Sequence, residues 1–137
     1  MQMNPYLSFD GKCADAFAFY AKALGAKVEV TMPYAGSPMA DHVPAGWGSK
    51  IMHGRITIGD QLLMASDAMP DCYQKPQGFS VTLNIADSAE AERTFHALAD
   101  GGTVGMPIQE TFWASRFGTV TDRFGIPWMI NCEKPMG

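Results

Sequence analysis

His53 and Arg55 are the side chains of this sequence best suited to chemistry near neutral pH. They stand two residues apart in the segment IMHGRITI, whose alternation of apolar and polar residues predicts a β-strand over 51–58. Because side chains alternate between the two faces of a strand, both should face the same way. A histidine can act as a general base, and an arginine can hold an anionic group. A single histidine on a strand is also commonly a structural hydrogen-bonding residue, so His53 is a candidate catalytic residue with a structural alternative.

An aromatic cluster near the C-terminal end is the second candidate site. Phe112, Trp113 and Phe117 could form one wall of a pocket for a planar ligand, and Arg116 could anchor an anionic group beside it. Core packing or a dimer contact would suit the same residues. The sequence leaves these alternatives open.

Other reactive side chains give weaker indications. Glu110 and Asp122 flank the aromatic segment and could do acid–base chemistry as a pair, but both lie beside expected turns, where we expect exposed carboxylates. The three cysteines, Cys13, Cys72 and Cys132, are far apart and form neither a disulfide framework nor a zinc pattern, so we expect reduced thiols. No GxGxxG, GxxxxGKS, GxSxG or HExxH motif occurs, so nucleotide binding and serine hydrolysis have no motif support.

Eight strands and two helices are expected to position these residues. Asp10 and Asp87 are the expected helix N-caps, and Gly25 and Gly101 the expected stops. The segment 33–48, with three prolines and three glycines, is expected to be a long loop. The predicted helices are 13–24 and 88–99, and the predicted strands are 5–9, 27–32, 51–58, 61–65, 78–85, 103–107, 110–122 and 126–132.

The order of these elements occurs twice along the chain. Pairs of similar residues recur at one constant offset: Leu7 with Leu83, Phe9 with Ile85, Phe19 with Phe95, Gly25 with Gly101 and Val28 with Val104. The sequence therefore predicts an α+β fold of two βαβββ modules, which form a curved mixed sheet around a cleft. The single domain 1–137 would consist of module one at about 1–67, a connector at about 68–77 and module two at about 78–133.

Strand alternation also sorts the candidate pocket residues. The apolar residues of each strand should lie under a helix, so that the polar residues either face the cleft or are simply solvated. Met129 lies in the last strand, and methionines suit an adaptable pocket or an ordinary core. The predicted ligand pocket comprises Tyr6, Ser8, His53, Arg55, Ser80, Thr82, Asn84, Trp113, Arg116 and Met129.

Three segments resemble a known family. They are PYLSFDGKCADAFAFYAKALGA at 5–26, MASDAMP at 64–70 and ETFWASRFGTVTDRFGIPWMIN at 110–131. In this order, and within a doubled βαβββ frame, they resemble the vicinal-oxygen-chelate superfamily of glyoxalases, bleomycin-resistance proteins and dioxygenases, and in particular its PhnB-like branch. The resemblance covers nearly the whole chain and implies a glyoxalase-like fold and a homodimer.

Metal-using members of that superfamily place four ligands, usually His, Glu or Gln, on strands that face the cavity. The matching positions of this chain hold none of these residue types, so the resemblance implies neither a metal nor another cofactor here. Those positions are Asn4 or Pro5, Leu63 or Met64, Ser80 or Phe79, and Met129.

Composition limits the remaining function classes. The chain has 137 residues, 47% of them hydrophobic and 18% charged, which is typical of a globular domain. A net charge of -4 argues against nucleic-acid binding, and no apolar run approaches a membrane span, so we expect a cytoplasmic protein. The resulting hypothesis is a metal-independent small-molecule binding protein of unknown ligand. The alternative is a metal-dependent or His53-based lyase, isomerase or dioxygenase of the same fold, so whether the chain is an enzyme stays open.

Overall fold

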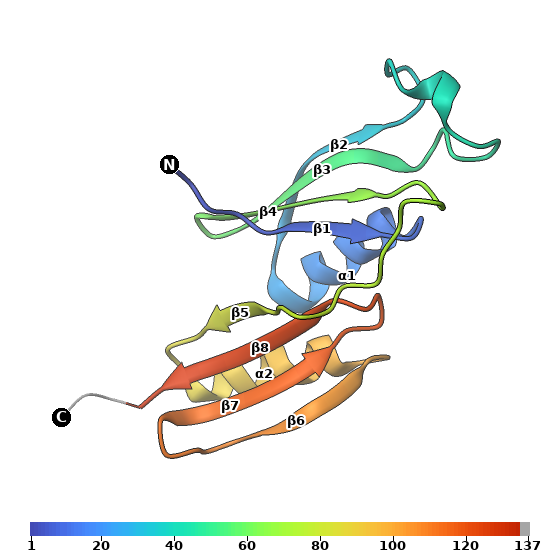
Figure 1. The fold of residues 1–137 in the computed structure, drawn as a ribbon. Coiled ribbons are helices and arrows are strands. Elements are labelled where there is room, and N and C mark those ends of the chain that lie inside the picture. Colours follow the sequence, from blue (N-terminus) through green and yellow to red (C-terminus); the bar gives the residue numbers. More distant parts are fainter. Residues whose placement is uncertain (135–137) are drawn as a thin grey trace. The chain divides into compact units, whose positions relative to one another are not determined.

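The computed structural model describes residues 1–134 and divides the chain into two compact units. Unit 1 is Met1–Gln74, and unit 2 begins at Lys75. Each unit has the order strand, helix, strand, strand, strand, with one helix on one face of a four-stranded sheet (Figure 1). The predicted α+β fold of two βαβββ modules is therefore confirmed, and the boundary between the units falls inside the expected connector.

Unit 1 forms a mixed sheet in the order β1-β4-β3-β2. Strand β1 runs parallel to β4, and the other two pairs are antiparallel. Strand β4 extends two residues beyond the predicted end at Ala65, because it continues its pairing with β1 as far as Asp67. The elements are β1 (Tyr6–Phe9), α1 (Cys13–Leu24), β2 (Lys27–Pro33), the 3₁₀ turn η1 (Ala40–His42), β3 (Ile51–Ile58) and β4 (Gln61–Asp67).

Unit 2 repeats this arrangement in the order β5-β8-β7-β6, again with one parallel pair, β5 with β8. Strand β5 is shorter than predicted, because Gly78 has a positive φ of 82° and Phe79 is exposed, so pairing begins only at Val81. The elements are β5 (Val81–Asn84), α2 (Ser88–Ala99), β6 (Thr103–Gln109), β7 (Ala114–Thr121) and β8 (Pro127–Glu133).

The helix of each unit packs closely against a glycine of the sheet. A Cβ atom added to Gly54 on β3 would lie 2.5 Å from Cε2 of Phe17 on α1. In unit 2, a Cβ on Gly118 of β7 would lie 2.7 Å from Cε2 of Phe95 on α2. Both phenyl rings are buried, and each ring occupies the space that a side chain at the glycine would need.

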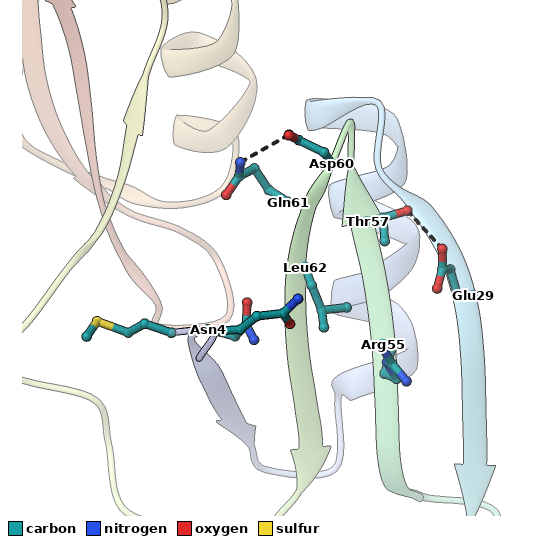
Figure 2. Close-up of a pocket in the computed structure, with 9 residues that line it drawn as sticks. Asn4, Glu29, Arg55, Thr57, Asp60, Gln61 and Leu62 are labelled. Carbon is teal, nitrogen blue, oxygen red and sulfur yellow. Dashed lines mark hydrogen bonds between the residues drawn. The ribbon is translucent and has the colours of Figure 1, made fainter.

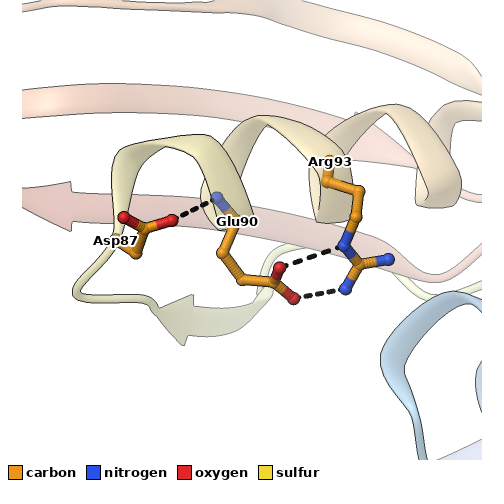
Figure 3. A network of polar contacts seen from close by, with 3 residues as sticks. All are labelled: Asp87, Glu90 and Arg93. Carbon is orange, nitrogen blue, oxygen red and sulfur yellow. Dashed lines mark hydrogen bonds and ion pairs between the residues drawn. The ribbon is translucent and has the colours of Figure 1, made fainter.

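The two helices begin in different ways. At α2 the predicted N-cap is confirmed: the Asp87 carboxylate accepts the Glu90 N–H at 2.9 Å (Figure 3). The Glu90 side chain pairs with Arg93 instead of closing a capping box. At α1 the prediction of Asp10 as N-cap is wrong, because the helix starts after Lys12 without a side-chain cap from its own turn.

Asp67, at the end of β4, takes over that role in unit 1. Its buried carboxylate accepts the first helical N–H, that of Cys13, at 2.9 Å through Oδ1, and the Ile51 N–H at 2.9 Å through Oδ2. Its backbone oxygen accepts the Tyr34 hydroxyl at 2.7 Å. One residue therefore joins the start of α1, the start of β3 and the start of the long loop.

The long loop between β2 and β3 is further fixed at its far end. Lys50 donates from Nζ to the Gly11 backbone oxygen at 2.9 Å, and the rings of Tyr34 and Trp47 meet edge to face at 6.3 Å. The predicted loop is thus present and anchored to the first strand–helix turn. Neither helix of the described residues is long and apolar enough to cross a membrane.

Candidate functional site

The sheet of unit 1 has one face under α1 and one face turned away from it, which we call open face 1. Leu7, Ile56 and Leu63 lie buried on the helix side. The alternate residues lie on open face 1, where Tyr6 of β1 is paired with Met64 of β4, and Met64 with Arg55 of β3. The predicted polar face of this module is therefore formed by adjacent strands.

His53 makes a specific contact on open face 1. Its Nδ1 lies 3.1 Å from the Tyr6 hydroxyl oxygen, and the two rings stack with centroids 5.8 Å apart and planes 27° apart. The contact crosses β4 and joins two residues that are 47 positions apart in the sequence. If Tyr6 donates, Nδ1 is unprotonated and the ring proton sits on Nε2. The sequence suggested His53 alone, and the structure adds the hydroxyl that orients it.

A cavity of about 360 Å³ lies at one end of open face 1 (Figure 2). Arg55 reaches into it, and among residues 1–134 its guanidinium has no ion pair or hydrogen bond. Glu29 on β2 accepts a bond from the Thr57 hydroxyl at 3.4 Å. The cavity thus offers one free guanidinium beside amide groups and two carboxylates, those of Glu29 and Asp60, a set suited to a zwitterionic ligand. Its lining residues are Gln2, Met3, Asn4, Glu29, Arg55, Thr57, Asp60, Gln61 and Leu62.

Unit 2 has a corresponding open face 2 on the side of its sheet away from α2. Trp128 and Ile130 of β8 are buried on the helix side, so that the alternate residues Met129 and Asn131 lie on open face 2. Ser80 precedes β5, and Thr82 and Asn84 share this face. A second cavity, of about 640 Å³, is lined by Asn84, Ile85, Ala86, Asn131 and Glu133.

The aromatic cluster forms as expected, but Arg116 does not join it. The rings of Phe112 and Trp113 meet edge to face at 4.8 Å, and those of Trp113 and Phe117 at 5.3 Å. Arg116 lies on the helix side, where its Nε donates to Glu92 of α2 at 2.7 Å. Because that guanidinium is already paired on the other side of the sheet, we leave Arg116 out of the pocket.

Asp122 differs most from expectation. The prediction that it is exposed is wrong: the side chain is buried, with Oδ1 accepting the N–H groups of Phe124 and Ile126 at 2.8 and 3.1 Å. Its Oδ2 accepts the Trp128 indole N–H at 2.8 Å. Glu110 is exposed and lies 3.7 Å from Lys134. These carboxylates therefore do not form an acid–base pair; Asp122 organises the β7–β8 turn.

The structure also selects among the four positions that match the metal ligands of the superfamily. Leu63 lies under α1, whereas Met64 and Met129 lie on the open faces and Asn4 lines the cavity of about 360 Å³. Phe79, which is exposed, and Ser80 both precede β5. The candidate positions are therefore Asn4, Met64, Ser80 and Met129, with Phe79 as the alternative to Ser80. An amide, a hydroxyl and two thioethers do not fit a divalent metal that needs imidazole or carboxylate ligands. Within residues 1–134, no cluster of three His, Cys, Asp or Glu side chains could hold a metal ion.

The predicted pocket residues therefore fall into two groups. Tyr6, Ser8, His53 and Arg55 lie on open face 1, and Ser80, Thr82, Asn84 and Met129 lie on open face 2, with Trp113 in the adjoining loop. Sequence reasoning missed Asn131, although its place in the alternation Pro127, Met129, Asn131 of β8 could have identified it. It also missed Asp67, whose bonds connect residues far apart in the sequence.

Comparison with known proteins defines the class. A family model described as 3-demethylubiquinone-9 3-methyltransferase matches residues 1–131, and the chain belongs to this family. The chain is 41% identical to Protein YjdN of Escherichia coli (strain K12) over 142 residues, which cover 98% of this chain and 97% of YjdN.

Solved structures show the same fold. The crystal structure of protein PA1353 from Pseudomonas aeruginosa is similar with a TM-score of 0.88 and 48% identity, over 98% of this chain and 99% of that protein. A PhnB protein from Bacillus cereus has a TM-score of 0.80 at 21% identity, over 96% and 99% of the two chains. The latter likeness concerns the fold alone.

Proposed function

We propose that this chain is a metal-independent binding protein for a small molecule, held on the open faces of its sheets. The observation that carries the proposal is the set of side chains at the four metal-ligand positions, Asn4, Met64, Ser80 and Met129. The positions that bind a metal in the superfamily hold here groups that contact organic ligands better than divalent cations, which supports the proposal.

The free guanidinium of Arg55 supports an anionic group on the ligand. An arginine that has no carboxylate partner among the described residues retains its full capacity for bidentate bonds to a carboxylate. The nearby Glu29 would favour a ligand that also carries a donor or a positive charge.

The first experiment is a thermal-melt titration of chelator-treated protein with Zn²⁺, Ni²⁺, Mn²⁺ and Fe²⁺. A specific metal at 100 times its Kd would stabilise the protein by about 2.7 kcal/mol, a shift of several degrees, so the proposal expects no saturable shift. A saturable shift with one metal would contradict metal independence and favour the metal-dependent enzyme.

The second experiment screens small aromatic and carboxylate compounds in the same assay. For an anionic ligand found in this way, Arg55→Ala should weaken binding by about tenfold, the equivalent of one lost charge-assisted bond of about 1.4 kcal/mol. Arg93→Ala is the matched control, because Arg93 is exposed on α2 and paired with Glu90. Equal affinities in the native protein and in Arg55→Ala would remove Arg55 from the site.

The bond between Tyr6 and His53 supports a second candidate function, an enzyme of the same fold. A tyrosine hydroxyl that donates a hydrogen bond to an imidazole can pass its proton to Nδ1 and then take a proton from the ligand, so the pair can act as a general base. Ligands from the screen would be incubated with the protein and followed by NMR for conversion. Under this alternative His53→Ala abolishes turnover while circular dichroism is unchanged; under the binding proposal it changes only affinity. A loss of stability of about 1 kcal/mol or more in His53→Ala would instead indicate a structural role.

We also propose that the protein acts as a cytoplasmic homodimer. Strands β2 and β6 each lie at one of the two edges of their sheet, and every residue of β2 is exposed, including Val28, Val30 and Met32. Unpaired strand edges with apolar side chains favour association with another copy. Light scattering coupled to size-exclusion chromatography should give twice the mass of the chain, and a monomer at micromolar concentration would contradict this part of the proposal.

A further inference from the structure

Open face 2 holds a pair of asparagines whose hydrogen bonding is incomplete. Asn84 of β5 and Asn131 of β8 are register partners in the parallel pair, and Asn131 donates from Nδ2 to Oδ1 of Asn84 at 3.0 Å. Oδ1 of Asn131 is buried and, within residues 1–134, has no hydrogen-bond partner. A buried acceptor without a donor costs about 1 to 3 kcal/mol, so this oxygen would gain a hydrogen bond from a ligand that supplies a donor.

The chemistry of that partner follows from the amide group. Nδ2 of Asn131 carries two hydrogens, and the bond to Asn84 uses one of them. One N–H donor and the Oδ1 acceptor therefore remain on a single planar group. A ligand that presents a C=O and an N–H side by side complements both, as a lactam or a carboxamide does. This match holds for either assignment of the oxygen and nitrogen of the Asn131 amide, because the amide and the ligand each offer one donor and one acceptor.

Space and an aromatic surface are available next to this amide. Asn84 and Asn131 both line the cavity of about 640 Å³. On the other side of Asn131, its register partner on β7 is Phe117, whose ring meets Trp113 edge to face. Residues directly opposite each other on an antiparallel pair have neighbouring side chains, so an aromatic ring adjoins the amide on the same face. Trp113 is 46% exposed, which leaves the apolar surface accessible.

We propose that open face 2 binds planar aromatic lactams or carboxamides, with Asn131 bonding to the cis-amide edge and with Phe117 and Trp113 contacting the ring. Asn84 acts as a positioning residue, because its Oδ1 holds the Asn131 amide. A ligand reaches Oδ1 when the Asn131 amide turns toward the cavity about χ2, a broad torsion for this side chain. This turn releases the bond to Asn84, so Asn84 positions the amide in the ligand-free protein. The inference rests on the proposed binding function and adds the chemical class of the ligand.

The test uses the full chain and three probes: 1(2H)-isoquinolinone, 2-pyridone and benzamide. Isothermal titration should show saturable binding, with the bicyclic lactam tightest because it offers the largest ring surface. The decisive control is N-methyl-isoquinolinone, which keeps the ring and the carbonyl but lacks the donor. Its affinity should be at least tenfold lower, because the Asn131 oxygen would remain without a partner.

Two variants locate the site. Asn131→Leu keeps the size of the side chain without its polar atoms and should lower lactam affinity at least tenfold, while Gln77→Ala, which removes an exposed amide ahead of β5, should leave it unchanged. The comparison of the two ligands needs no variant, so it remains valid even if Asn131→Leu does not fold. Equal affinity for the lactam and its N-methyl form, or binding that survives Asn131→Leu, overturns the inference.

The failures of the two proposals can be told apart. If none of the three probes binds while other compounds from the screen do, the lactam inference is wrong and the binding function stands. A saturable metal shift in chelator-treated protein would overturn the metal-independent function itself, whatever the lactams do.

Discussion

Replacing Asp122 by asparagine tests whether one buried carboxylate holds the β7–β8 turn. The aspartate accepts three hydrogen bonds, two from backbone N–H groups of the turn and one from the Trp128 indole. In Asp122→Asn, Oδ1 can still accept the two backbone N–H groups, but the new NH₂ group faces the indole N–H, so two donors meet. One bond to a charged acceptor, about 1.5 to 3 kcal/mol, is lost and the other two become neutral bonds.

The expected total is a loss of about 3 kcal/mol in the free energy of unfolding, or roughly 10 °C in Tm for a chain of this length. Urea unfolding followed by circular dichroism would measure it. A double-mutant cycle with Trp128→Phe isolates the indole bond, because the phenyl ring removes the donor and keeps most of the apolar surface. We expect a coupling energy of about 1 to 2 kcal/mol between the two positions.

The matched control is Glu110→Gln. Glu110 is the other carboxylate beside this segment. It is exposed, and its Oε2 makes a surface ion pair with Nζ of Lys134 at 3.7 Å, so its replacement should change stability by less than about 0.5 kcal/mol. If Asp122→Asn is as mild as Glu110→Gln, or if its effect adds to that of Trp128→Phe without coupling, the assignment of Asp122 as the organiser of the turn is refuted.

Three further predictions concern the rest of the framework. Gly54→Ala should lower the free energy of unfolding in urea by about 1 to 3 kcal/mol, because its Cβ would lie 2.5 Å from the Phe17 ring. Adding Phe17→Leu to the same chain should recover part of this loss. An unchanged stability of Gly54→Ala would mean that α1 can shift away from the sheet without cost. Burial, and then the charge of Asp67, raise the pKa of the Cys13 thiol from 9.0 to about 12. Because the pKa of the Cys13 thiol is higher in the folded state than in the unfolded state, its contribution to stability is complete below pH 9 and is lost between pH 9 and 12. The free energy of unfolding should fall by up to about 1.4 kcal/mol per pH unit in this range, and an equal fall in Cys13→Ala would contradict this cause. Asp87→Ala should cost about 1 kcal/mol by removing the cap of α2, and an unchanged urea midpoint would show that water replaces the cap.

Much of the fold could be predicted from the spacing of apolar residues and from the residues that end helices or form turns. The helix 13–24 was predicted from apolar residues at helical spacing and from the stop at Gly25, and the structure has both. The doubled order of elements was visible because equivalent residues recur at one offset. The ends of the strands were predicted less accurately. Strand β4 continues to Asp67 because it pairs with β1, which is distant in sequence, and this pairing decides where the strand ends.

The candidate site was predicted in outline. Alternation placed Tyr6, His53 and Arg55 on one face, because side-chain direction along a strand depends only on position. It did not reveal that the Tyr6 hydroxyl meets the His53 ring, a contact that crosses an intervening strand. Arg116 was assigned to the pocket because it adjoins the aromatic residues in sequence, but its partner is a carboxylate on α2.

Local sequence was sufficient to predict the two modules, the faces of their strands and the side chains at the positions that bind a metal in the superfamily. All three depend on local rules: periodicity, turn residues and residue type. The folded structure was needed to show which polar groups are hydrogen-bonded and which have no partner among the described residues. Asp67 and Asp122 are buried with several donors each, whereas Oδ1 of Asn131 is buried with none among the described residues. Hydrogen bonds and burial depend on atoms brought together from distant parts of the chain, and local sequence does not encode those distances.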